Sequence, residues 1–267
     1  MVSPHKGVVR ICCAQVGSRW DAPAVNLRQA ARCAGEAAEH GADVIVFPEQ
    51  YATGWDPRAT SHAEPTGGPV QSAYAAIAGE SGITVVGSAR IMGDAGLTNS
   101  CVVYGPEGEL LTSYAKMHLF SPAGEEMVYT PGNSLGCFAV GGVQFGLAVC
   151  YDLRFGDLFS AYARAGVHCV CVPAAWPCER LHHWRLFLAT RALENQYYVA
   201  GAGTIGTTPV GEYCGGTAVM GPDGEERAAA GDGERLLFAD IDAGEVGRVR
   251  ASFPVTADRR DDLYRRL

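Results

Sequence analysis

The sequence has 267 residues, of which 48% are hydrophobic, and this length and apolar content favour one substantial domain over several small ones. The formal net charge is −8, and the first basic runs are Arg259–Arg260 and Arg265–Arg266, so we expect no nucleic-acid partner, which would need a basic stripe. No run of about 18 apolar residues occurs, which predicts no membrane span.

Strand-like and helix-like segments alternate along the chain, which predicts a layered α/β fold with residues 1–267 as one domain. Short apolar runs rich in β-branched residues indicate strands, and apolar residues at helical spacing that stop at a glycine indicate helices. In chain order we expect a strand at 8–16, a helix at 22–40, a strand at 44–47, a helix at 68–81, strands at 83–89, 97–104 and 110–114, two strands within 138–149, a helix at 157–165, a strand at 167–172, a helix at 179–195, strands at 197–202 and 235–241, and a helix at 243–250.

Two stretches predict hairpins with nearly identical turns, GPEGE at 105–109 and GPDGE at 221–225. Each places proline and glycine where a hairpin turn needs them, and each follows an apolar strand-like run. The repetition indicates two similar sheets. By contrast, segment 121–133 has no strong periodicity, so we expect a loop, and loops over a sheet commonly carry function.

Three strand-like segments each have one ionisable residue at their exit. Glu49 follows the run DVIVF and Pro48, Lys116 follows 110–114, and Cys150 ends the run VQFGLAV. A thiol attacks a carbonyl carbon well only as a thiolate, and a carboxylate in an apolar pocket can move protons near neutral pH. A cysteine in an apolar run is, on its own, more often a small buried hydrophobe than a nucleophile.

The ordered set Glu49, Lys116 and Cys150 resembles the nitrilase, or carbon–nitrogen hydrolase, superfamily. Further landmarks extend the resemblance over nearly the whole chain: PAAWP at 173–177, HW at 183–184, TRALENQ at 190–196, GPDGE at 221–225 and DRRDDLY at 258–264. The resemblance implies a four-layer α-β-β-α sandwich, usually paired through a helical face into a homodimer or larger oligomer. It also implies amide hydrolysis with no cofactor and no metal.

The resemblance implies the following catalytic roles. Glu49 takes the thiol proton, Cys150 attacks the amide carbon, and Lys116 with the backbone N–H of Tyr151 holds the oxyanion. Ammonia leaves, and water activated by Glu49 cleaves the thioester. The family often carries a second glutamate six residues before a Pro-Gly, a place that Glu125 occupies before Pro131, with Glu126 as its competitor.

Other side chains are candidates for binding the substrate. Arg154 is the candidate for a substrate carboxylate, because guanidinium binds carboxylate through two parallel hydrogen bonds. An internal ion pair of Arg154 with Glu194 or Asp157 is the alternative. Trp176 and Tyr51 are expected to line the pocket, although packing in the core is nearly as common for such side chains. We expect three nearby polar residues to be structural, namely Asp152, His118 and His183.

The leading expectation is an ω-amidase-like enzyme for a small amide that bears a carboxylate. The alternatives are an N-carbamoyl amino acid hydrolase, an amidase for a peptide-like amide, a nitrilase, an acyltransferase and an inactive binding or scaffold member. We expect the tail 255–267 to pack against a partner subunit or its own sheet edge, since it holds Leu263 and Tyr264 among charges.

The chain contains ten cysteines, most of them in apolar strand-like runs, and no paired CxxC sets with zinc spacing. This pattern predicts reduced, buried thiols in a cytoplasmic protein and no metal site. Residues 1–16 lack the long apolar segment of a signal peptide.

Overall fold

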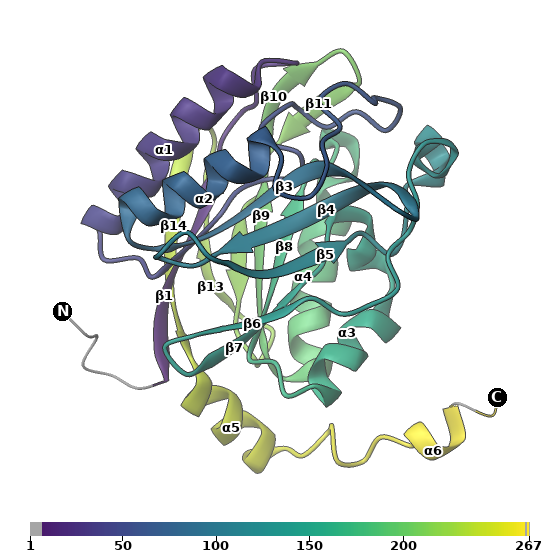
Figure 1. Cartoon of the computed structure of the whole chain (residues 1–267). Coiled ribbons are helices and arrows are strands. Elements are labelled where there is room, and N and C mark those ends of the chain that lie inside the picture. The colour runs from purple at the N-terminus through teal and green to yellow at the C-terminus, as the bar shows by residue number, and fades with distance from the viewer. Residues whose placement is uncertain (1–6, 265, 267) are drawn as a thin grey trace.

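The computed structural model describes residues 7–264 and Arg266, so the first six residues of the segment 1–16 lie outside the described part. Two six-stranded sheets face each other, with α1 (Pro23–Glu39) and α2 (Pro69–Ser81) covering one and α3 (Gly156–Arg164) and α4 (Leu181–Asn195) covering the other (Figure 1). The expected α-β-β-α layering and the single α/β domain are confirmed. No helix of the described chain is both long and apolar enough to pass through a lipid bilayer.

The first sheet is built mainly from the N-terminal half of the chain. Its central strands β1, β2 and β3 are parallel, and the outer pairings of β1 with β14, β3 with β4 and β4 with β5 are antiparallel. In sheet order the strands are β14 (Arg235–Asp242), β1 (Val8–Gln15), β2 (Val44–Val46), β3 (Thr84–Gly93), β4 (Gly96–Tyr104) and β5 (Leu110–Ala115).

The second sheet repeats this arrangement, with parallel central strands β7, β8 and β9 and antiparallel edges. Its order is β13 (Glu226–Ala229), β12 (Ala218–Met220), β9 (Tyr198–Gly203), β8 (Cys169–Ala174), β7 (Val143–Leu147) and β6 (Cys137–Val140). The two hairpins with matching turns, β4–β5 and β12–β13, therefore lie in different sheets, as their repetition predicted.

Alternation along each strand builds the layers, because successive side chains point to opposite faces of a sheet. On β1, Ile11 and Cys13 face the second sheet and pack with Phe145 and Leu147. Cys12 points the other way, beneath the alanine-rich face of α1. The helices are α1 (Pro23–Glu39), α2 (Pro69–Ser81), α3 (Gly156–Arg164), α4 (Leu181–Asn195), α5 (Ala243–Ser252) and α6 (Asp261–Tyr264).

Two local features differ from the sequence expectation. Strand β7 ends at Leu147 rather than at Val149, and Cys150 opens a short 3-10 helix, η3 (Cys150–Arg154). A small hairpin of β10 (Ile205–Thr208) and β11 (Gly211–Cys214) stands apart from both sheets and was not predicted. Both features lie close to the candidate active site, because η3 carries Cys150 and β11 carries Tyr213, which lines its entrance.

The cysteines are not all reduced, which corrects the expectation from their pattern. Cys178 and Cys214 form a disulfide that joins the short helix η4 (Cys178–Arg180) to β11. The other eight described cysteines are free, and six of these are buried. The pairing was missed because the two residues lie 36 positions apart in segments that show no strand or helix pattern of their own.

Candidate active site

Three residues from separate strand exits meet between the two sheets. Glu49 follows β2 and Lys116 follows β5, both in the first sheet, whereas Cys150 follows β7 in the second. Glu49 and Lys116 are each 1% exposed and Cys150 is 8% exposed. The facing of the sheets thus places an acid, an ammonium and a thiol in one buried cluster, which the catalytic roles implied by the resemblance require.

Lys116 is held between two carboxylates. Its Nζ donates hydrogen bonds of 2.8 Å to Oε1 of Glu49 and 2.8 Å to Oε2 of Glu125. Asn99 on β4 donates through Nδ2 to the same two carboxylates, at 2.8 Å to Glu49 and 2.9 Å to Glu125. Glu125 is fully buried, whereas Glu126 is exposed, so the geometry favours Glu125 over its competitor.

The protonation of this cluster follows from its burial. Burial raises the pKa of Glu49; the Lys116 ammonium opposes this, and the charge of Glu125 adds to it. Burial alone lowers the pKa of Lys116, but the two carboxylates outweigh burial and raise it. Lys116 therefore remains an ammonium, and Glu49 is a carboxylate with a higher proton affinity than an exposed glutamate.

The Cys150 thiol needs a base to react. Burial raises the pKa of this thiol well above 9.0, and the neighbouring Glu49 carboxylate raises it further, although Lys116 lowers it. Glu49 is thus the carboxyl group that acts most strongly on the pKa of this thiol. A thiol whose pKa is raised needs a neighbouring general base to form a thiolate, and Glu49 is the carboxyl group in that position.

Cys150 occupies an unusual backbone conformation at the start of η3. Its φ is 47°, in the left-handed region that a non-glycine residue rarely adopts and that costs of order 1–3 kcal/mol. Asp152 stabilises this turn, because its Oδ2 accepts a 2.9 Å hydrogen bond from the N–H of Val149. The turn directs the chain from β7 into η3 and places the sulfur at the end of a pocket.

Asp152 also links the two sheets. It accepts hydrogen bonds from the hydroxyl of Tyr114 at 2.8 Å and from the N–H of His118 at 2.9 Å, so it joins η3 to the segment that carries Lys116. The His118 ring stacks on Phe155 with 3.8 Å between centroids. The structural roles expected for Asp152 and His118 agree with these contacts. His183 lines neither of the two cavities described below.

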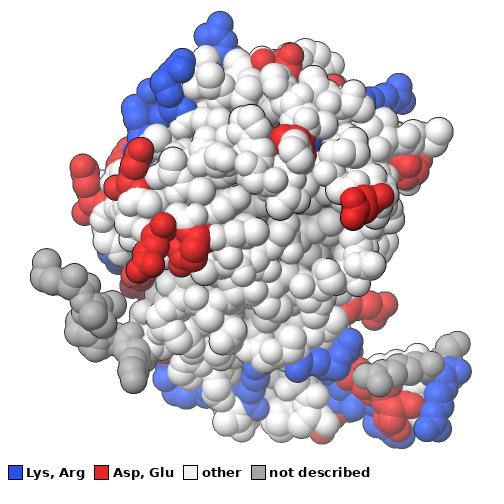
Figure 2. All heavy atoms as spheres, viewed as in Figure 1, with Lys and Arg blue, Asp and Glu red and all other residues white. Residues whose placement is uncertain are grey.

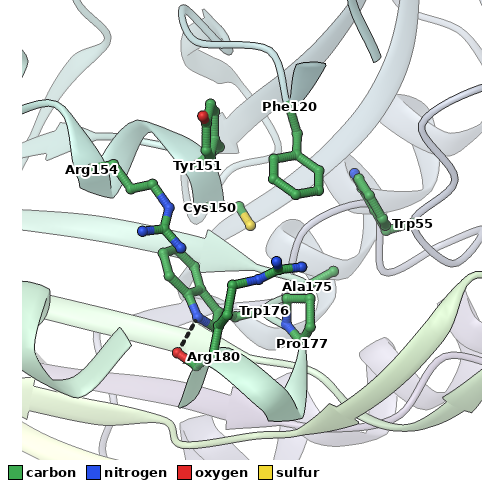
Figure 3. A pocket seen from close by; sticks show the side chains of 9 residues that line it. All are labelled: Trp55, Phe120, Cys150, Tyr151, Arg154, Ala175, Trp176, Pro177 and Arg180. Atoms are coloured by element: carbon green, nitrogen blue, oxygen red, sulfur yellow. Dashed lines mark hydrogen bonds between the residues drawn. The ribbon is translucent and has the colours of Figure 1, made fainter. Parts of the chain in front are cut away.

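An aromatic pocket opens in front of the Cys150 sulfur (Figure 3). It is small, with a volume of about 20 Å³, and it shares lining residues with a larger outer chamber of about 510 Å³ that is bounded partly by η4 and β11. In Figure 3 the side chain of Arg154 enters from one side and that of Arg180 from another, with the sulfur between them. The inner pocket is lined by Trp55, Phe120, Cys150, Tyr151, Arg154, Ala175, Trp176, Pro177 and Arg180.

Arg154 stacks on the pocket wall and forms no ion pair with a described residue. Its guanidinium carbon lies 4.7 Å from the Trp176 ring centroid and 5.4 Å from that of Phe187. The alternative partner Glu194 is bound instead to Arg191, at 2.8 Å. The internal ion pair considered for Arg154 is therefore absent from the described chain, and the guanidinium faces the cavity. Trp176 lines the pocket, as expected.

Tyr51 does not line the pocket, which corrects the sequence expectation. Its ring is fully buried in the core beneath α1 and α2 and stacks on Phe47 with 5.4 Å between centroids. The chain reverses at Gln50, which has a φ of 47°, and this turn directs the Tyr51 side chain back into the core. Trp55, later in the same loop, reaches the pocket instead.

Sequence reasoning missed three residues that the structure brings to the site. Asn99 is hidden within an ordinary strand pattern, although it bonds both carboxylates. Phe120 lines the pocket from the loop after Lys116, where an aromatic residue beside a candidate catalytic residue was the available signal. Arg180 stood within a segment predicted as helix, and nothing in its spacing indicated that its side chain reaches the pocket.

Comparison with known proteins gives consistent similarities. Residues 10–251 match the family model described as carbon-nitrogen hydrolase. The chain is 32% identical over 256 residues to 2-oxoglutaramate amidase of Bacillus subtilis, covering 95% of this chain and 98% of that protein. It is 35% identical over 253 residues to Omega-amidase NIT2 of Danio rerio, covering 90% of each.

Solved structures are similar to this chain as well. A glutamate variant of the amidase from Nesterenkonia sp. AN1 shares the fold with a TM-score of 0.87 and 28% identity, covering 100% of this chain and 99% of that one. In that protein the acetamide moiety of fluoroacetamide is covalently added at the active site cysteine.

Proposed function

The chain belongs to the carbon-nitrogen hydrolase family and is an enzyme that hydrolyses an amide C–N bond, and we propose that Cys150, Glu49 and Lys116 perform this reaction on a small amide that bears a carboxylate. The observation that carries the proposal is the buried Glu49–Lys116–Glu125 cluster beside a cysteine at the end of a pocket. Burying three charged side chains away from solvent costs folding free energy, so a role in catalysis accounts for their presence.

In the first step Glu49 accepts the thiol proton while the Cys150 sulfur attacks the carbonyl carbon of the amide. The raised pKa of the thiol makes this transfer necessary, and Glu49 is the carboxyl group beside the thiol that can accept the proton. The carbonyl double bond becomes a single bond to an oxyanion. Fixed donors around such an oxyanion contribute about 3–4 kcal/mol each to the transition state.

Lys116 and the backbone N–H of Tyr151 are the proposed donors to the oxyanion. Lys116 is held in place by its two carboxylate partners, so its third N–H bond is the one left for substrate. Tyr151 directly follows the nucleophile at the start of η3, and its side chain lines the pocket. Both donors are fixed before the substrate arrives, which is what makes such stabilisation effective.

The intermediate then collapses with transfer of a proton from Glu49 to the amide nitrogen. The C–N bond breaks, ammonia leaves, and the acyl group remains on Cys150 as a thioester. Glu49, again a carboxylate, takes a proton from a water molecule that attacks the thioester carbon. The C–S bond breaks, the thiolate recovers the proton, and the carboxylic acid is released.

We assign Glu125 a positioning role. It accepts hydrogen bonds from Lys116, from Asn99 and from the N–H of Phe120, the last at 2.6 Å. These contacts fix the ammonium of Lys116 and link the charged cluster to an aromatic wall of the pocket. Its negative charge also contributes to the raised pKa of Glu49.

Arg154 is the proposed binding group for the substrate carboxylate. Its guanidinium faces the pocket, has no acidic partner among the described residues, and is held by stacking on Trp176. The relative from Bacillus subtilis is named for 2-oxoglutaramate, a compound that carries both an amide and a carboxylate. An acid at one end of the substrate and an amide at the other match a pocket with Arg154 at one side and Cys150 at its end.

The proposed substrate class is tested by the release of ammonia from succinamate and from its neutral isostere succinamide. Arg154→Lys keeps the charge but removes the two-pronged geometry, so it should reduce kcat/KM for succinamate at least about tenfold more than for succinamide. Equal losses on both amides would rule out the carboxylate role. Including an N-carbamoyl amino acid and a nitrile in the same assay tests the two other reaction classes.

A homodimer is the proposed assembly, and the cytoplasm is the proposed compartment. Leu186 and Leu193 on α4 are 63% and 57% exposed, and Phe253 before the tail is 70% exposed, so covering them would remove apolar surface from water. The tail extends away from the body of the molecule (Figure 1). The tail carries both positive and negative charges, and the face in Figure 2 shows no continuous basic stripe.

The eight free cysteines support the cytoplasm as the compartment, whereas the disulfide between Cys178 and Cys214 is unusual for a cytoplasmic protein.

A further inference from the structure

A second guanidinium group lies at the same pocket as Arg154. Arg180 comes from η4, a different element from the η3 helix that carries Arg154, and it lines both the inner pocket and the outer chamber (Figure 3). These two arginines are the only charged side chains among the described residues that line the inner pocket. The remaining lining is mostly aromatic, so two positive charges share an apolar cavity.

The position of Arg180 is fixed by its own backbone and by its neighbours. Its carbonyl oxygen accepts a 2.8 Å hydrogen bond from Nε1 of Trp176, and its guanidinium carbon lies 5.8 Å from the ring centroid of Phe120. The disulfide from Cys178 to Cys214 fixes the start of η4. Arg180 therefore contacts Trp176 and Phe120, which both line the pocket, near the junction with the outer chamber.

The only acidic partner of Arg180 in the described chain is weakly held. Nη2 of Arg180 lies 2.7 Å from Oε1 of Glu179, but the two side chains are 36% and 69% exposed. An exposed ion pair of this kind contributes about 0–1 kcal/mol, so an incoming carboxylate can replace Glu179 at little cost. Arg154, for its part, has its pKa lowered by burial and also by the charge of Arg180, as expected for two cations facing one cavity.

We propose that Arg154 and Arg180 bind one substrate carboxylate together, as a two-guanidinium clamp that selects a singly charged acid amide. The proposal rests on the proposed function, in which Arg154 binds that carboxylate. A bound carboxylate removes the repulsion between the two guanidinium groups and satisfies donors of both. Glu179 and Glu212 also line the outer chamber, and these acids oppose binding of a second carboxylate there.

The clamp is tested with the intact enzyme by measuring kcat/KM for succinamate and succinamide. Four variants are compared with the wild type: Arg154→Gln, Arg180→Gln, Glu179→Gln and the control Arg185→Gln, whose side chain is exposed on α4 and lines neither cavity. Dividing the value for succinamate by that for succinamide gives an acid preference, from which any common loss of folded enzyme cancels.

We expect Arg180→Gln to lower the acid preference at least about tenfold, mainly through a higher KM for succinamate. Glu179→Gln should raise the acid preference about two- to fivefold, because it removes the carboxylate that competes with the substrate for Arg180. Damage to the fold would not raise this preference. Arg185→Gln should leave it unchanged.

Two outcomes overturn the clamp, and they are distinguishable from failure of the proposed function. If Arg154→Gln removes the acid preference while Arg180→Gln and Glu179→Gln leave it intact, the carboxylate role stands and the clamp is wrong. If the wild type shows no acid preference, or Arg154→Gln does not change it, the proposed carboxylate recognition fails and the clamp fails with it.

Discussion

The Nζ atom of Lys116 lies 2.8 Å from Oε1 of Glu49, and both side chains are completely shielded from solvent. Removing one member of a buried ion pair leaves an uncompensated charge and typically costs about 3–5 kcal/mol. Glu49 is thus at once the partner of Lys116 and the group beside the Cys150 thiol. This dual position means that changes at Glu49 are best made with isosteric side chains.

Glu49→Gln should stop acylation while keeping the fold. An amide cannot accept the thiol proton, and loss of a general base typically reduces the rate about 10²–10⁴-fold. Single-turnover ammonia release measures the loss of acylation, and thermal unfolding of the same variant measures any loss of stability. Rapid acylation by this variant would exclude Glu49 as the base.

Glu125→Gln should move the acidic limb of the pH–rate profile to lower pH. The active form has Glu49 ionised, so kcat/KM falls as pH decreases through the pKa of Glu49, which lies above the ordinary 4.5. The charge of Glu125 is one cause that raises this pKa, and removing it lowers the pKa. The pH dependence of kcat/KM for succinamide measures the shift.

Glu126→Gln is the matched control for this experiment. Its side chain is exposed one position away from the buried Glu125 and makes no hydrogen bond with the described cluster. We expect its acidic limb to coincide with that of the wild type. If both variants shifted the limb equally, or if Glu125→Gln shifted it to higher pH, the assigned role of Glu125 would be wrong.

Reduction of the disulfide between Cys178 and Cys214 should destabilise the entrance of the pocket. The bond closes a sequence separation of 36 residues, for which loop-closure entropy gives about 3–4 kcal/mol, or about 5–10 °C in Tm. We expect dithiothreitol to lower both Tm and the kcat/KM for succinamate, because η4 carries Arg180. The double variant Cys178→Ser, Cys214→Ser should not respond to the reductant, and an identical response of the two proteins would contradict the prediction.

Deleting residues 255–267 should weaken a dimer. Leu263 and Tyr264 in this tail are 38% and 57% exposed, and Asp261 forms a 3.4 Å ion pair with Arg164 of α3, so the described part of the tail leaves apolar side chains in water. Residues 265 and 267 lie outside the described part. Sedimentation of the truncated protein, with Met92→Gln as an exposed apolar control, measures the effect. An unchanged dimer after truncation would show that the tail does not contribute.

The sequence allowed Glu49, Lys116 and Cys150 to be singled out because each stands at the exit of a strand-like segment and because the three in this order resemble the family. Strand exits can be located from hydrophobic pattern alone, and the facing of two sheets brings such exits together. Glu125 required the resemblance, since its loop has no periodicity. Its burial then distinguished it from Glu126.

Side chains that line the pocket could not be predicted in the same way. Tyr51 and Trp55 lie in one loop, yet the turn at Gln50 directs the first into the core and leaves the second at the pocket. The place of Arg180 depends on η4 and on a disulfide to a hairpin that has no clear strand pattern. Loop conformation is set by tertiary contacts, which local sequence does not reveal.

The most direct test of the central claim is to locate the acyl group during turnover. The enzyme is mixed with succinamate, quenched in acid within the first turnovers and analysed by peptide mass spectrometry. We predict a succinyl group on the peptide that contains Cys150, and neither this adduct nor ammonia release in Cys150→Ala. Ammonia release that persists in Cys150→Ala, or an acyl group found on another residue, would contradict the account.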